Sequence, residues 1–123
     1  MEKVYANNAP DAIGPYSQAV KVGNLLFTSG QIAINPGTSV IDAVDIEGQT
    51  EQVCQNICAI LEAAGTSFDR VVKTTCFLAD MDDFAAFNII YAKYFLSKPA
   101  RSCVAVKTLP KNVLVEVEVI AEL

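Results

Sequence analysis

The side chains best suited to chemistry lie in the segment 98–106, KPARSCVAV. Its composition after the proline predicts a β-strand, in which alternate side chains point to opposite faces of a sheet. Arg101 and Cys103 then share one face. The opposite face, which we expect to belong to the core, carries Ser102, Val104 and Val106. A planar guanidinium is well shaped to hold a carboxylate, although a strand arginine can equally form an ordinary salt bridge.

A second candidate group is a carboxylate near the C-terminus. Glu116 and Glu118 share one face of a predicted strand, whereas the opposite face carries Val115, Val117, Val119 and Ala121. A glutamate in a pocket can hold and deprotonate a reacting water molecule. The alternative interpretation is an ordinary solvent-facing strand glutamate with no catalytic role. The chain has no histidine, which excludes Ser-His and Cys-His nucleophilic catalysis and most transition-metal sites.

Composition restricts the class of protein. The chain has 123 residues, 52% of them hydrophobic, and we expect one domain spanning 1–123. A net charge of −5 opposes general affinity for nucleic acid. No apolar run is long enough for a bilayer span and no signal peptide is recognisable, so we expect a cytoplasmic protein without membrane contact. The four cysteines lack metal-site spacing, and we expect reduced thiols and no metal.

Elements that could position these groups follow from hydrophobic periodicity and turn signals. We predict strands at 18–22, 25–31, 70–79, 101–107 and 113–122. Helices are predicted at 46–64 and from Asp80 to a point before Pro99. The order β-β-α-β-α-β-β predicts an α+β fold, with two helices on one face of a mixed sheet. The other face keeps apolar side chains, and we expect it to pack against another subunit.

Five motifs stand out along the chain: GPYSQA (14–19), FTSGQI (27–32), ADMDDFAAFN (79–88), PARSCVAV (99–106) and VEVE (115–118). In this order and spacing they resemble the RidA/YjgF family of enamine/imine deaminases. The resemblance implies a chorismate-mutase-like fold of the bacillus type and a homotrimer with pockets at its subunit interfaces. It also implies hydrolysis of 2-imino acids such as 2-aminoacrylate and 2-iminobutanoate to 2-oxo acids and ammonia, a form of metabolite repair that needs no cofactor.

The resemblance also assigns roles residue by residue. It places the carboxylate-binding arginine at Arg101 and the water-positioning glutamate at Glu116, the two expected catalytic groups. It places substrate-binding groups at Tyr16, Ser29, Gly30, Asn88 and Cys103. Without the resemblance, a turn tyrosine, a strand-end serine and a helix-surface asparagine would be the simpler interpretations. Ala105 and Val117 depart from the family pattern at positions outside the expected pocket.

Two other functions remain open from the sequence. A small-carboxylate-binding regulatory module would need Arg101 but not a carboxylate beside the ligand. A ribonuclease or translation inhibitor is the third interpretation, and the acidic balance and the absence of histidine count against it.

Overall fold

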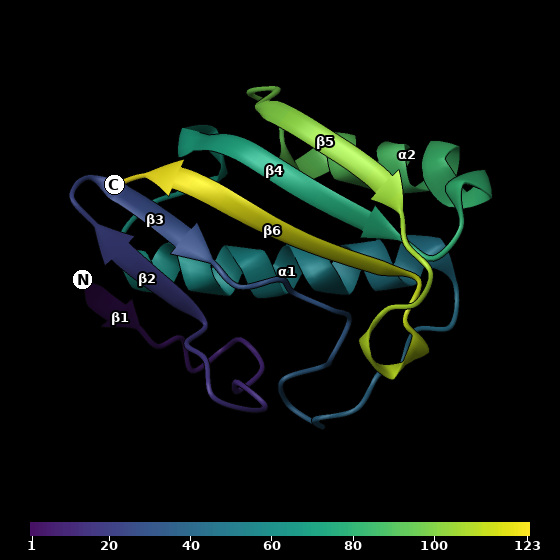
Figure 1. Cartoon of the computed structure of the whole chain (residues 1–123), viewed down its shortest axis with the longest axis horizontal. Helices are drawn as coiled ribbons and strands as arrows, with labels where there is room; N and C mark the ends of the chain where they lie inside the picture. The colour runs from purple at the N-terminus through teal and green to yellow at the C-terminus, as the bar shows by residue number, and fades with distance from the viewer.

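The computed structural model describes residues 1–123 and forms one six-stranded mixed sheet with two helices (Figure 1). The sheet order is β1-β2-β3-β6-β4-β5, and β4–β5 is its one parallel pair. The strands are β1 (Glu2–Val4), β2 (Ala19–Val22), β3 (Leu25–Thr28), β4 (Val71–Leu78), β5 (Ala100–Ala105) and β6 (Val115–Glu122). The helices are α1 (Ile46–Ala64) and α2 (Phe84–Tyr94).

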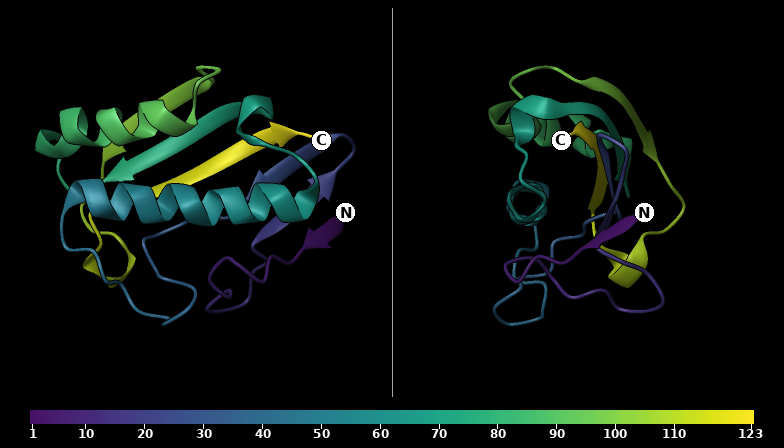
Figure 2. Two further views of the ribbon diagram at one scale, coloured as in Figure 1. Left: turned by 180° about the vertical axis from the view of Figure 1, so that it is seen from behind. Right: turned by 90° about the vertical axis from the view of Figure 1, so that its left-hand side faces the viewer.

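Both helices lie on the same face of the sheet, which Figure 2 shows from the side. The predicted two-layer α+β fold is therefore confirmed, and the predicted elements fall where the hydrophobic pattern places them. The short strand β1, which pairs with β2 at the sheet edge, was not predicted. Two exposed residues followed by one buried valine give no periodic signal that could be read from sequence. Neither helix has the length and apolar character needed to cross a membrane.

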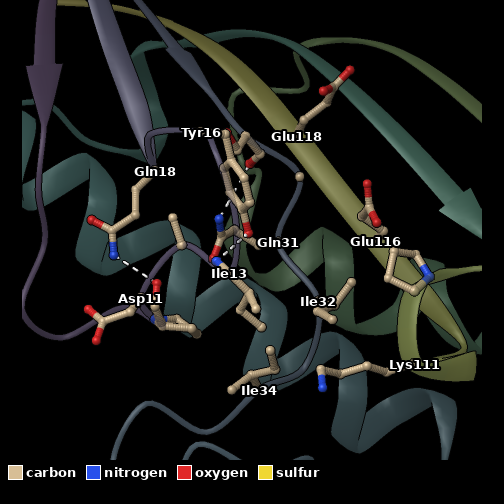
Figure 3. A pocket seen from close by; sticks show the side chains of 15 residues that line it. Asp11, Ile13, Tyr16, Gln18, Gln31, Ile32, Ile34, Lys111, Glu116 and Glu118 are labelled. Carbon is tan, nitrogen blue, oxygen red and sulfur yellow. Dashed lines mark hydrogen bonds between the residues drawn. The ribbon is translucent and has the colours of Figure 1, made fainter.

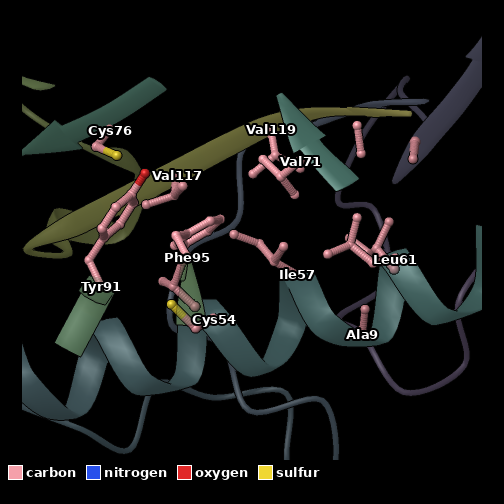
Figure 4. Close-up of a cluster of buried hydrophobic side chains, with 14 of the residues drawn as sticks. Ala9, Cys54, Ile57, Leu61, Val71, Cys76, Tyr91, Phe95, Val117 and Val119 are labelled. Atoms are coloured by element: carbon pink, nitrogen blue, oxygen red, sulfur yellow. The ribbon is translucent and has the colours of Figure 1, made fainter. Parts of the chain in front are cut away.

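The core lies between the sheet and the two helices, α1 and α2 (Figure 4). Strand β6 runs through the middle of the sheet and contributes Val115, Val117, Val119 and Ala121, each at most 2% exposed. Full burial of each of the three valine side chains contributes about 1.5–3 kcal/mol. The alternation predicted for this strand is thus confirmed, and Glu116 and Glu118 are left on the face that the helices do not cover.

Local capping fixes where the helices begin and end. The Asp45 carboxylate accepts a hydrogen bond from the Gly48 amide at 2.8 Å, which satisfies a free donor at the start of α1. Gly65 ends this helix with φ 82°, a left-handed conformation that suits glycine. Before α2, Asp80 accepts from the Asp82 amide at 2.8 Å and caps a 3-10 turn, Met81–Asp83, that continues into the helix.

Strand β5 corrects one prediction. Its register pairs Cys103 with Cys76 on the helix-covered side and Val104 with Phe77 on the open side. The alternation was right, but the orientation was wrong, because Val104 is 48% exposed and does not belong to the core of the chain. The reason is that α2 covers this edge strand from the side on which Arg101 and Cys103 lie, so the polar pair faces the helix.

Candidate active site

Four of the expected pocket residues line one cavity of about 610 Å³ beside β3 and β6 (Figure 3). They are Tyr16, Ser29, Gly30 and Glu116. Tyr16 enters the hollow from the loop before β2, and Glu116 enters from β6 on the other side. Residues far apart in the sequence are thus brought together on one chain.

Hydrogen bonds decide what Tyr16 and Ser29 can offer a ligand. The Tyr16 hydroxyl oxygen accepts from the Ile13 amide at 3.2 Å, which leaves its proton free to donate. The Ser29 hydroxyl donates to the Ser17 carbonyl at 2.6 Å, so only its lone pairs remain available. Tyr16 can therefore donate to a ligand, whereas the Ser29 hydroxyl can only accept from one.

Gly30 allows the glutamate side chain to lie against the backbone. A β-carbon at this position would lie 2.2 Å from Oε2 of Glu116, which no ordinary contact permits. The Gly30 amide has no hydrogen-bond partner within the chain and is half-buried beside that carboxylate. A ligand placed here would meet a free backbone donor and a carboxylate together.

The surroundings of Glu116 oppose its ionisation. Burial raises the pKa of this carboxyl above its ordinary value, and the like charge of Glu118 raises it further. A carboxyl group with a raised pKa holds a proton more tightly than usual. It is therefore better suited to exchanging a proton with a reacting group near neutral pH than an exposed glutamate is.

The other expected residues lie elsewhere on the chain. Arg101 and Asn88 line a second hollow of about 390 Å³ between α2 and the start of β5. Nη1 of Arg101 donates to Oδ1 of Asn88 at 2.8 Å, which uses one of the five guanidinium donors. Cys103, two residues further along β5, is half-buried and packs against the hydrophobic core.

The thiol of Cys103 is not activated by its neighbour. Burial raises the pKa of Cys103, and the opposing effect of the Arg101 charge does not reverse that rise. The thiol therefore stays protonated and is a poor nucleophile at neutral pH.

The two groups of residues lie on opposite faces of the sheet. Arg101 pairs with Thr74 and Glu116 pairs with Phe77, on the two strands that flank β4. Along the strand direction Arg101 and Glu116 are offset by three residues of β4, and across the sheet they are two strand spacings apart. These two offsets together separate their backbone positions by about 14 Å in the plane of the sheet. One small ligand cannot contact both side chains of the same chain.

Comparison with known proteins gives a consistent result. A family model described as Endoribonuclease L-PSP matches residues 6–123. A RutC family protein of Pyrococcus horikoshii is 57% identical, over 98% of this chain and 96% of its own. The solved structure of YyfA from Yersinia pestis, of the conserved Rid protein family, is 50% identical with a TM-score of 0.96, over 99% of this chain and 98% of its own. The chain belongs to the RidA/YjgF family.

A further solved member of the RidA/YjgF family bears on ligand chemistry. TdcF of Escherichia coli, with bound serine, is 42% identical to this chain, with a TM-score of 0.95 and coverage of 100% of this chain and 99% of its own. Membership confirms the resemblance seen in the motifs and the fold that it implied. It does not by itself assign an activity, since the family description, Endoribonuclease L-PSP, points to a different chemistry from imine hydrolysis.

Sequence reasoning missed residues that shape the first cavity. Gln18 is 3% exposed, and its amide group accepts from the Ala6 amide at 2.6 Å and donates to the Pro10 carbonyl at 2.8 Å. It thereby holds the loop that forms one cavity wall. A glutamine on the inward face of a predicted strand was the available signal, because a buried amide must find backbone partners. Lys111, which also lines the cavity, gave no such signal.

Proposed function

We propose that the chain hydrolyses reactive 2-imino acids and their enamine forms, such as 2-aminoacrylate and 2-iminobutanoate, to 2-oxo acids and ammonia. One observation carries the proposal. The chain presents an arginine with unused donors at one surface, and a carboxyl group of raised pKa beside a free backbone amide at another. These are the groups that the two ends of a 2-imino acid require.

The two surfaces would meet between chains. A ligand held by Arg101, on the edge strand β5 of one chain, could lie against Glu116 of a neighbour if that edge packs against the neighbour's open sheet face. That face carries partly exposed apolar residues, Val22 at 52%, Phe27 at 38% and Val104 at 48%, which favour such packing. Closed rotational symmetry would repeat the contact without leaving an unpaired surface, and the family resemblance makes the number of chains three.

The chemistry needs one water molecule and one proton carrier. Arg101 would bind the ligand carboxylate, while Tyr16 and the Gly30 amide donate to its polar atoms. Glu116 takes a proton from water as the water oxygen bonds to the carbon of the protonated imine, whose C=N π electrons move to the nitrogen and give a neutral amine. The same carboxyl group then returns that proton to the nitrogen. As the C–N bond breaks, the new hydroxyl group loses its proton to solvent and becomes the carbonyl, and ammonia leaves. In this scheme Cys103 forms part of the pocket wall.

A coupled assay tests the proposal. Threonine dehydratase generates 2-iminobutanoate in situ, and 2-oxobutanoate formation is followed with and without the purified chain. Arg101→Ala should reduce the acceleration by about 10- to 150-fold, because a charge-assisted hydrogen bond contributes about 1.5–3 kcal/mol. Arg101→Lys should also be impaired, since an ammonium cannot make the paired contact.

The chain's other arginine supplies a matched control. Arg70 bonds to the Glu122 and Leu123 carbonyls at the far end of the sheet, so Arg70→Ala should retain the acceleration if it remains folded. A folded Arg101→Ala variant with wild-type acceleration would contradict the proposal.

A regulatory module that binds a small carboxylate or amino acid is the second candidate. The bound serine in TdcF supports it, because an amino acid offers the same carboxylate to an arginine. Calorimetric binding of 2-oxobutanoate or serine without any acceleration of imine hydrolysis would favour this function over the first.

A further inference from the structure

The guanidinium of Arg101 is held between aromatic rings and not by an acid. Its central carbon lies 4.8 Å from the ring centroid of Tyr91 and 5.4 Å from that of Phe84. Together with Asn88, these residues are spaced four and three apart on α2, so they lie on one side of the helix. One helix face therefore provides two rings and an amide for a single charged group.

No carboxylate neutralises this arginine. The salt bridges of the chain are Lys21–Glu2 and Lys93–Glu51, and neither involves Arg101. Ring faces attract a cation through their quadrupole and carry no net charge, and Asn88 is also neutral. An acidic partner would compete with a ligand carboxylate for the same donors, whereas rings and an amide fix the guanidinium and leave its full charge available.

The ring of Tyr91 is itself fixed from behind. Its hydroxyl shares a buried hydrogen bond with Oγ1 of Thr74 at 2.8 Å, and its ring stacks on Phe95 with centroids 4.3 Å apart. Thr74 is also the β4 residue paired with Arg101 in the sheet register. The backbone position of Arg101 and the plane of the ring beneath it are thus set by the same residue of β4.

From this arrangement we infer that Tyr91 is a positioning residue of the carboxylate subsite. Its ring holds the Arg101 guanidinium in the orientation that leaves the unused donors facing a ligand, and its hydroxyl serves only to fix the ring. This inference rests on the proposed function at one point, the binding of a ligand carboxylate by Arg101.

Calorimetric binding of 2-oxobutanoate to the full chain tests the inference. Tyr91→Leu should weaken binding by about 2- to 30-fold, the range for loss of a partly desolvated cation–π contact. Tyr91→Phe keeps the ring and should stay within about threefold of wild type. Tyr94→Leu, on the same helix but bonded to Glu51, should leave binding unchanged.

A spectroscopic signature separates positioning from general damage to the core. The chain has two arginines, so the side-chain NMR signals of Arg101 can be assigned by comparison with Arg101→Ala. Ring currents should shift its δ-methylene protons upfield in wild type and in Tyr91→Phe, and that shift should shrink in Tyr91→Leu.

The outcomes are distinguishable. If Arg101→Ala loses binding while folded Tyr91→Leu binds within twofold of wild type, the positioning inference is overturned and the proposed function stands. If Arg101→Ala binds as wild type does, the carboxylate role of Arg101 fails as well. Should Tyr91→Leu not fold, Tyr91→Met also removes the ring and fills more of its space with a flexible side chain, and unchanged binding by that variant would overturn the inference.

Discussion

Glu116 connects protein stability to the proposed chemistry at the scale of a single residue. Burial and Glu118 raise the pKa of its carboxyl, so the folded chain binds this proton more tightly than the unfolded chain does. The ionised form therefore costs stability. That cost is absent below the ordinary glutamate pKa of about 4.3, grows as the pH rises to the raised value, and is complete above it.

Glu116→Gln removes the ionisation and should separate stability from activity. At pH 7 the variant should melt at a higher temperature than wild type, and the difference should vanish near pH 4. Its acceleration of imine hydrolysis should fall by about 10²- to 10⁴-fold, as for loss of a general acid–base group. Thermal unfolding at both pH values and the coupled assay measure the two effects. A variant less stable at pH 7 would mean that a favourable partner, such as Arg101 of a neighbouring chain, holds the ionised carboxylate.

At the scale of elements, sequence patterns within single segments were enough to predict most of the helices and strands. Strand β6 shows strict alternation, and α1 has an apolar stripe and a glycine stop, so both could be predicted closely. The orientation of β5 could not, because alternation states which residues share a face and not which face the helix covers. That choice depends on the position of α2, which a single segment does not encode.

The orientation of β6 decides where an assembly test must be made. Val119 is 2% exposed and faces the helices, so an acid there would unfold the chain. Ile120 lies on the open face opposite Phe27. Ile120→Asp should leave the circular dichroism of the fold intact but prevent association and abolish the acceleration, because a charge cannot be buried in an apolar contact.

Sedimentation, circular dichroism and the coupled assay on this variant measure the three properties. Val44→Asp, at a loop position 87% exposed, introduces the same charge and should change none of them. A folded Ile120→Asp monomer with wild-type acceleration would show that the open face is not needed.

At the scale of the whole molecule, we propose that the candidate site belongs to an assembly and not to one chain. The resemblance selected the expected residues, yet no sequence pattern states that Arg101 and Glu116 lie on opposite faces of the sheet. That separation depends on β4 lying between β5 and β6. It is therefore set by pairing between strands that are far apart in the sequence. If the two residues serve one ligand, each site must combine halves from two chains.

Mixing two inactive variants gives the sharpest test of a shared site. Arg101→Ala chains keep Glu116, and Glu116→Gln chains keep Arg101, so neither variant alone can form a complete site. When equal amounts of the two variants assemble at random into rings, an interface joins an intact arginine to an intact glutamate with a probability of one half times one half. Activity should therefore return to about a quarter of the wild-type value after the variants are unfolded and refolded together. The same proteins refolded separately and then combined should stay inactive until their chains exchange. Co-refolded rings that contain both variants, as seen by mass spectrometry, but remain inactive would show that the two residues do not act on one ligand across an interface.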